Sequence, residues 1–108
     1  MDPVDLTNLR DMTAGDRELE KTLFEEFYRS CASCLATLAA STAEASSEQW
    51  RTAAHAMKGI SYNLGANPLG DLCKQAQDDH TADSSAKQSL LGQIESEYTR
   101  VKSFLEAA

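Results

Sequence analysis

Apolar residues recur at intervals of three and four positions along most of the chain, which is the spacing of one face of an α-helix. This periodicity predicts a short helix over residues 4–12 and four longer helices over residues 16–40, 48–64, 68–79 and 86–106. Small and polar residues separate them. The sequence therefore predicts an all-α fold, an antiparallel four-helix bundle preceded by a short N-terminal helix.

Capping residues mark several of the predicted helix ends. Asp5 is a plausible cap for the first helix and Asp16 for the second, and one residue of the Ser46-Ser47 pair is suited to cap the third. Gly65 suits the left-handed position that ends the third helix. The Asn67-Pro68 pair then predicts an asparagine cap followed by proline at the first helical position.

The length and composition fit one globular domain covering residues 1–108. A chain of 108 residues is large enough for one hydrophobic core and too small for two. Its 42% hydrophobic and 25% charged residues are typical of a globular chain and not of a disordered one. We expect a monomer, because one exposed functional face leaves the remaining helix faces free to form a closed core.

The net charge and the hydropathy of the chain limit the classes of partner and the cell compartment that we expect. The formal net charge of −7 argues against nucleic acid and against an anionic membrane as a partner. No apolar run approaches the ~20 residues of a membrane span, and the N-terminal residues MDPVDLTNL lack the regions of a signal peptide. We therefore expect a free-standing cytoplasmic protein whose three cysteines stay reduced.

The third predicted helix contains the candidate chemistry. If Met57 marks the centre of its buried face, His55 lies about 160° away and faces water. Gly59 follows one turn later on the same side, and Lys58 flanks the histidine. Glycine in an exposed helix interior costs ~1 kcal/mol relative to alanine. This cost suggests that another molecule approaches the histidine ring closely.

These residues suit the transfer of a phosphoryl group. An exposed histidine is a usable nitrogen nucleophile near neutral pH. Lys58 would attract phosphate oxygens, and Gly59 would let the backbone of a partner come close. The spacing alone also allows an ordinary surface histidine beside a tolerated glycine.

The stretch HAMKGISYNLGANPLGDLC, residues 55–73, resembles the signature of histidine-containing phosphotransfer (Hpt) domains of multistep phosphorelays. The segment Leu6-Thr7-Asn8-Leu9, the Gly15-Asp16 step and the acidic-apolar helix leading to Phe27 are similar to the family as well, so the resemblance covers nearly the whole chain. It implies a phosphocarrier without kinase activity. Such a protein shuttles a phosphoryl group between receiver-domain aspartates of a two-component phosphorelay.

The resemblance also implies roles for individual residues. His55 would be the phosphorylated nucleophile, Lys58 would balance phosphate charge, and Gly59 would leave room for the partner. Gln77 matches by position a glutamine that orients the imidazole in several family members, whereas Gln75 points elsewhere on its helix. The partners would be receiver domains of response regulators or of a hybrid histidine kinase. Magnesium would belong to the receiver, so no cofactor and no metal site is expected in this chain.

The expected docking surface is the His55 side of the third helix, with Thr52, Ala56, Gly59 and Tyr62. Two positions depart from the family pattern. Ile60 stands where serine is frequent, and Tyr62 stands where a small residue is common, about 20° around the helix from His55. A tyrosine there should alter which receiver fits, and a half-buried bundle aromatic is the other interpretation.

Two further functions remain open. The first is a helical-bundle module that binds a response regulator without phosphotransfer. The second is a thiol redox protein, suggested by the spacing of Cys31 and Cys34, although these positions and Cys73 read better as small buried thiols. His80 lies in a polar break and is expected to be solvated. The sequence contains no phosphate-binding loop of the Gly-x-x-x-x-Gly-Lys type, so ATP-dependent autophosphorylation is not expected.

Overall fold

The computed structural model describes residues 2–108. Its elements are α1 (Thr7–Thr13), α2 (Arg17–Ala39), the 3-10 turn η1 (Glu44–Ser46), α3 (Ser47–Leu64), α4 (Asn67–Asp78) and α5 (Ser84–Ala107). Residues 2–108 contain no strand, so the predicted all-α class is confirmed. Within the same range, no helix combines the length and the apolar character that a membrane crossing requires.

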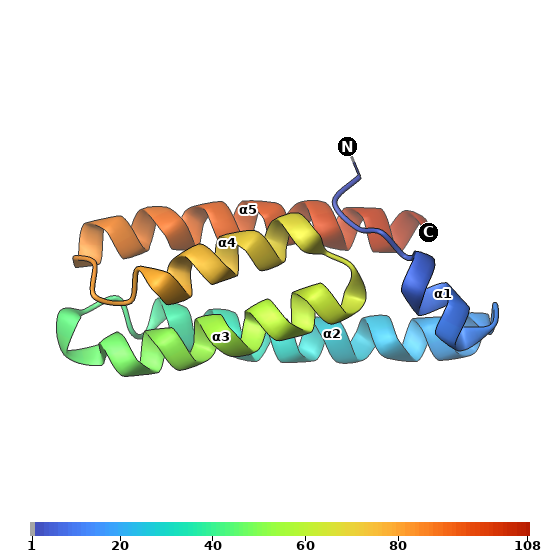
Figure 1. Cartoon of the computed structure of the whole chain (residues 1–108), viewed down its shortest axis with the longest axis horizontal. Helices are drawn as coiled ribbons and strands as arrows, with labels where there is room; N and C mark the ends of the chain where they lie inside the picture. Colours follow the sequence, from blue (N-terminus) through green and yellow to red (C-terminus); the bar gives the residue numbers. More distant parts are fainter. Residues whose placement is uncertain (1) are drawn as a thin grey trace.

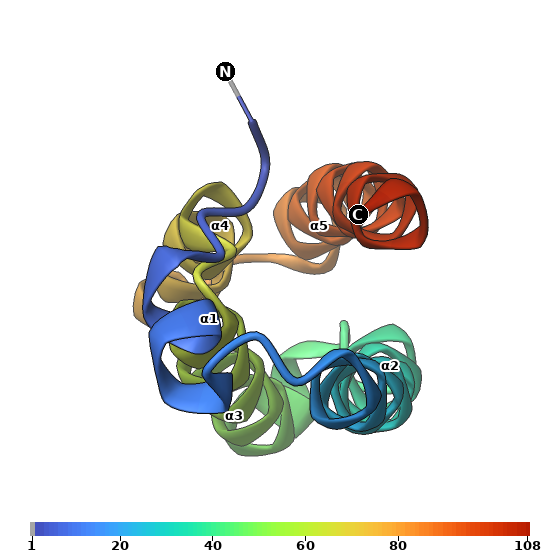
Figure 2. The same cartoon turned by 90° about the vertical axis from the view of Figure 1, so that its right-hand side faces the viewer.

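The four longer helices lie side by side along the 45 Å axis of the molecule, and successive helices run in opposite directions (Figure 1). α3 packs most extensively against α4 and next against α2. Seen end-on in Figure 2, α1 lies across the end of the molecule at which α2 begins and α5 finishes. The position of α3 between α2 and α4 means that both neighbours border its exposed face.

The core is built from the apolar faces of all five helices. Its fully buried side chains include Leu38, Trp50, Met57, Leu69, Ile94 and Val101. The indole N–H of Trp50 donates to the carbonyl oxygen of Ala76 over 2.8 Å, which satisfies the polar group of this large side chain. The ammonium of the buried Lys87 lies 5.7 Å from the centre of the same ring. This end of the core therefore joins α3, α4 and α5.

Aspartate side chains cap the N-termini of two helices, α2 and α5. The Asp16 carboxylate accepts a hydrogen bond from the Leu19 amide over 3.1 Å, as its position in the sequence predicts. Asp83 does the same for the amide of Ala86 over 2.8 Å, a cap that we did not anticipate. Because Asp83 supplies this cap, α5 begins at Ser84, within the stretch expected to be a polar break.

Two other helix starts differ from expectation. α1 begins at Thr7 instead of residue 4, and the Asp5 carboxylate accepts a hydrogen bond from the Thr7 amide over 3.0 Å. Ser46 occupies the N-cap position of α3, but its side chain makes no capping hydrogen bond. The turn η1 leads directly into α3 and the Ser47 amide bonds to the carbonyl of Glu44, so backbone groups replace the predicted serine cap.

A left-handed turn at Gly65 links α3 to α4. Gly65 has φ +92°, and the Ala66 amide donates to the Ser61 carbonyl over 2.9 Å, which closes the end of α3. Ala66 consequently takes the N-cap position of α4, so the predicted asparagine cap is displaced by one residue and Asn67 is already helical. The Asp5 amide donates to the Gly65 carbonyl over 2.9 Å and straps the N-terminal segment across this turn.

Replacing Gly65 by alanine should destabilise the fold. A Cβ at Gly65 would overlap the carbonyl oxygen of Asp5, and the positive φ adds backbone strain. We expect the free energy of unfolding to fall by roughly 2 kcal/mol or more. Urea unfolding followed by circular dichroism measures this free energy.

In the matched control Gly92→Ala, on α5, the new Cβ meets nothing within 4 Å, so the free energy of unfolding should rise by about 0.5–1 kcal/mol. Equal stabilities of the two variants would contradict this account.

Candidate functional site

His55 lies on the exposed side of α3. The helix buries a stripe formed by Trp50, Ala53, Ala54, Met57, Ser61 and Leu64. This stripe turns His55 and Gly59 toward solvent, as the helical spacing predicts, while Lys58 is half-buried at their flank. The histidine is therefore accessible to another molecule while its backbone is held by the most deeply packed helix.

The ring of His55 contacts a side chain of α4. Its Nδ1 lies 3.3 Å from Oε1 of Gln77, which is half-buried. An amide oxygen only accepts hydrogen bonds, so in this contact Nδ1 carries the hydrogen. Nε2 then keeps its lone pair and remains unobstructed by Gln77. The structure thus places Gln77 beside the histidine, whereas Gln75 is exposed on another side of α4.

The surface around the histidine is open on the α2 side. A Cβ built at Gly59 would meet no atom within 4 Å. Thr52 and Ala56, also exposed, border a hollow of about 440 Å³ between α2 and α3, whose α2 wall includes Ser33 and Thr37. A partner that reaches His55 would therefore find both an unobstructed helix surface and an adjoining depression.

Tyr62 lies against α4, on the other side of the His55 face. Its hydroxyl donates to Oδ1 of Asp71 over 2.6 Å, and this hydrogen bond raises the pKa of Tyr62 to about 12. The ring covers Gly70, where a Cβ would overlap it. The side chain is still 37% exposed, so it is both anchored to the bundle and available to a partner. We did not anticipate Gly70 and Asp71, and a glycine inside α4 was the only sequence signal for this contact.

A family model described as an Hpt domain matches residues 22–104. The chain belongs to this family. The match contains all of α3 and α4 and therefore every residue of the site described above. Hpt domains are phosphocarrier modules of phosphorelays that interact with receiver domains, and they are not kinases. No curated protein and no solved structure matched in the same comparisons.

The cysteines of this Hpt domain are core residues. Cys31 and Cys73 are fully buried, and desolvation raises the pKa of each to about 12. Cys34 is half-buried, and burial raises its pKa as well. None of these thiols has the thiolate character of a redox cysteine near neutral pH. Residues 2–108 also contain no group of three or more His, Cys, Asp or Glu side chains placed to hold a metal ion.

His80 differs from expectation. Instead of being fully solvated, it is half-buried, and its Nδ1 lies 3.1 Å from the backbone carbonyl oxygen of Gln77. The end of α4 leaves such carbonyl groups without helical partners, and the histidine ring occupies one of them. His80 thus supports the turn of α4 that carries the glutamine next to His55.

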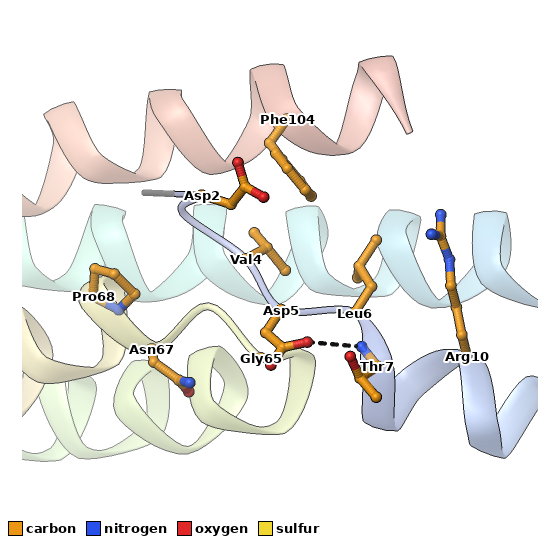
Figure 3. A pocket seen from close by; sticks show the side chains of 10 residues that line it. All are labelled: Asp2, Val4, Asp5, Leu6, Thr7, Arg10, Gly65, Asn67, Pro68 and Phe104. Atoms are coloured by element: carbon orange, nitrogen blue, oxygen red, sulfur yellow. Dashed lines mark hydrogen bonds between the residues drawn. The ribbon is translucent and has the colours of Figure 1, made fainter.

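A second hollow lies at the α1 end of the molecule. It has a volume of about 480 Å³ and is bordered by the N-terminal segment, the turn at Gly65 and Phe104 of α5 (Figure 3). The hydrogen bond between Thr7 and Asp5 lies at its edge and lowers the pKa of Asp5. The hollow contains none of the predicted site residues, so its position offers no support for a role in phosphotransfer.

The contact with Gln77 should determine the tautomer of His55. Nitrogen-15 chemical shifts of the neutral ring should show its hydrogen mainly on Nδ1. Gln77→Leu removes the acceptor and should shift the population toward the Nε2–H form. Gln75→Leu changes an exposed glutamine of the same helix and should leave the His55 signals unchanged. A Gln77→Leu spectrum identical to that of the wild type would contradict the assignment.

The thiols should be protected in the folded protein. Cys31 and Cys73 should not react with a thiol-specific chromogenic reagent near neutral pH, and Cys34 should react slowly. After denaturant is added, all three thiols should react together as the protein unfolds. Rapid reaction of Cys31 in the native protein would revive the interpretation of the Cys31 and Cys34 pair as a redox motif.

Proposed function

We propose that this Hpt domain carries a phosphoryl group on Nε2 of His55 and passes it between receiver-domain aspartates of a two-component phosphorelay. The observation that carries the proposal is the pairing of His55 Nδ1 with Gln77 Oε1 on an otherwise exposed ring. This pairing leaves one nitrogen free as a nucleophile and points it toward the surface that a partner can reach. The open position at Gly59 supports the same conclusion.

Transfer of the phosphoryl group from a receiver to His55 requires no proton to leave the imidazole ring. The Nε2 lone pair attacks the phosphorus of the aspartyl phosphate on a receiver. An N–P bond forms as the P–O bond breaks, and the aspartate carboxylate remains on the receiver. The hydrogen on Nδ1 stays, so the phosphorylated ring becomes cationic and its hydrogen bond to Gln77 becomes charge-assisted. Transfer to a second receiver reverses these bond changes.

The remaining residues would serve the transfer and the docking. Lys58 would balance the charge of the phosphoryl oxygens. Thr52, Ala56, Gly59 and Tyr62 would contact the receiver, whose own magnesium and acidic pocket complete the site. A small, transient interface suits a carrier that exchanges partners. We propose that the chain acts in the cytoplasm as a monomer, with α2–α5 as the antiparallel four-helix bundle of an Hpt domain and α1 across one end.

Phosphotransfer from a radiolabelled receiver tests the proposal. The wild type should acquire label that survives alkali and is lost in acid, as expected of phosphohistidine. His55→Gln should acquire none. His80→Gln is the matched control, because it removes the other histidine of the chain and should still be labelled.

Two outcomes would refute the phosphocarrier function. One is label on the His55→Gln variant. The other is a wild type that binds a phosphorylated receiver without acquiring label, with an affinity that His55→Gln does not change. The second outcome would instead identify a binding module that uses no phosphate chemistry.

A further inference from the structure

Two side-chain contacts fix the register between α3 and α4 on the exposed side. His55 meets Gln77 over 3.3 Å, and Tyr62 meets Asp71 over 2.6 Å. The earlier residue of α3 pairs with the later residue of α4, as expected for antiparallel neighbours (Figure 1). The stretch between these contacts is therefore a defined strip of surface, formed by one helical segment on each side.

Each segment contributes one lysine to this strip. Lys58 lies on α3, three residues after the histidine and four before the tyrosine. Lys74 lies on α4, three residues after the aspartate and three before the glutamine. Residues at these spacings share a helix face. Packed helix axes lie about 8–10 Å apart, so the flexible stems of both lysines span the distance to a group held between them.

Neither lysine is neutralised by a carboxylate. Within residues 2–108, Lys58 and Lys74 form no ion pair. Asp71 and Asp78 stand three residues before and four residues after Lys74, the spacings at which helical ion pairs form. In a protein with a net charge of −7, the strip that begins at His55 therefore contains two lysines without an ion-pair partner.

Tyr62 explains why Asp71 does not pair with Lys74. Its hydroxyl donates to the Asp71 carboxylate, and its ring is seated on Gly70, where any larger residue would displace it. The tyrosine hydroxyl thus occupies one oxygen of the carboxylate that stands at ion-pair spacing from Lys74. Gly70 thus leaves the space that the Tyr62 ring occupies, and the ring in turn brings the hydroxyl to Asp71.

We propose that Lys74 is a second phosphate-binding residue, which joins Lys58 in holding the phosphoryl oxygens at His55 and is kept unpaired by the Tyr62–Asp71 hydrogen bond. The inference rests on the proposed function. Lys58 approaches the group from α3 and Lys74 from α4, so the two ammonium groups contact different oxygens. Charge-assisted hydrogen bonds from both sides stabilise the charge that the group carries during transfer.

Labelling with phosphoramidate tests the role of Lys74 without a docking partner. In this reaction the P–N bond of the donor breaks and ammonia leaves as the bond from Nε2 of His55 to phosphorus forms. Lys74→Gln should slow labelling about three- to tenfold, a modest effect because the lysine is exposed. Lys74→Arg should stay near the wild-type rate. Lys21→Gln, an exposed position on α2, makes the same change in net charge and should have no effect.

A rescue experiment tests the role assigned to Tyr62. Tyr62→Phe frees the Asp71 carboxylate to pair with Lys74 and should slow labelling about twofold or more. Adding Asp71→Asn removes that competitor and should restore the rate. If Tyr62 contributed only to packing, the double variant would remain as slow as the single one, and this part of the proposal would fail.

The outcomes separate the two proposals. A wild type that neither phosphoramidate nor a phosphorylated receiver labels would refute the proposed function itself. A wild type that is labelled, together with a Lys74→Gln variant as fast as Lys21→Gln, would refute the second phosphate-binding residue alone. Thermal unfolding of each variant, followed by circular dichroism, confirms that rates are compared between folded proteins.

Discussion

The left-handed turn at Gly65 is the constraint on which the site depends. It ends α3, starts α4 within two residues, and so fixes which residues of the two helices lie opposite each other. The hydrogen bond from Trp50 to the carbonyl of Ala76 holds the same register at the far end of the pair. On α3, His55 lies between Trp50 and Gly65, and on α4 its partner Gln77 directly follows Ala76, so the contact follows from how the helices are joined and packed.

The site combines a firmly packed helix with an accessible side chain. α3 is anchored by a fully buried stripe that includes Met57, while His55 on its opposite side stays exposed. A phosphocarrier needs both properties, because the nucleophile must meet partners and yet present a defined nitrogen. Gln77 accepts a hydrogen bond from Nδ1 and so leaves Nε2 as the free nitrogen. Gly59 has no side chain that would hinder a partner from approaching the ring. In the proposed transfer few groups of this chain need to be positioned, since the receiver would bring the rest of the reaction centre.

A hydrogen bond on the surface also determines which charged side chains are free to form ion pairs. The Asp71 carboxylate could have formed a helical ion pair with Lys74, but the hydroxyl of Tyr62 holds it. A short hydrogen bond can thus set which charges of an acidic protein are available near a functional residue. This control needs no buried charge and no large rearrangement, and it leaves the aromatic ring itself partly exposed at the edge of the docking face.

The sequence by itself determined the helices and the outward position of His55, because both depend on local spacing and on the residues that suit caps and turns. Gln77 followed from the family resemblance, and its placement beside the histidine depended on tertiary packing. Only the tertiary structure revealed the Tyr62 contact with Asp71, the half-buried His80 and the burial of Lys87 against an aromatic ring. These features join residues on different helices or at a helix end, and periodicity within one helix does not encode the register that brings such groups together.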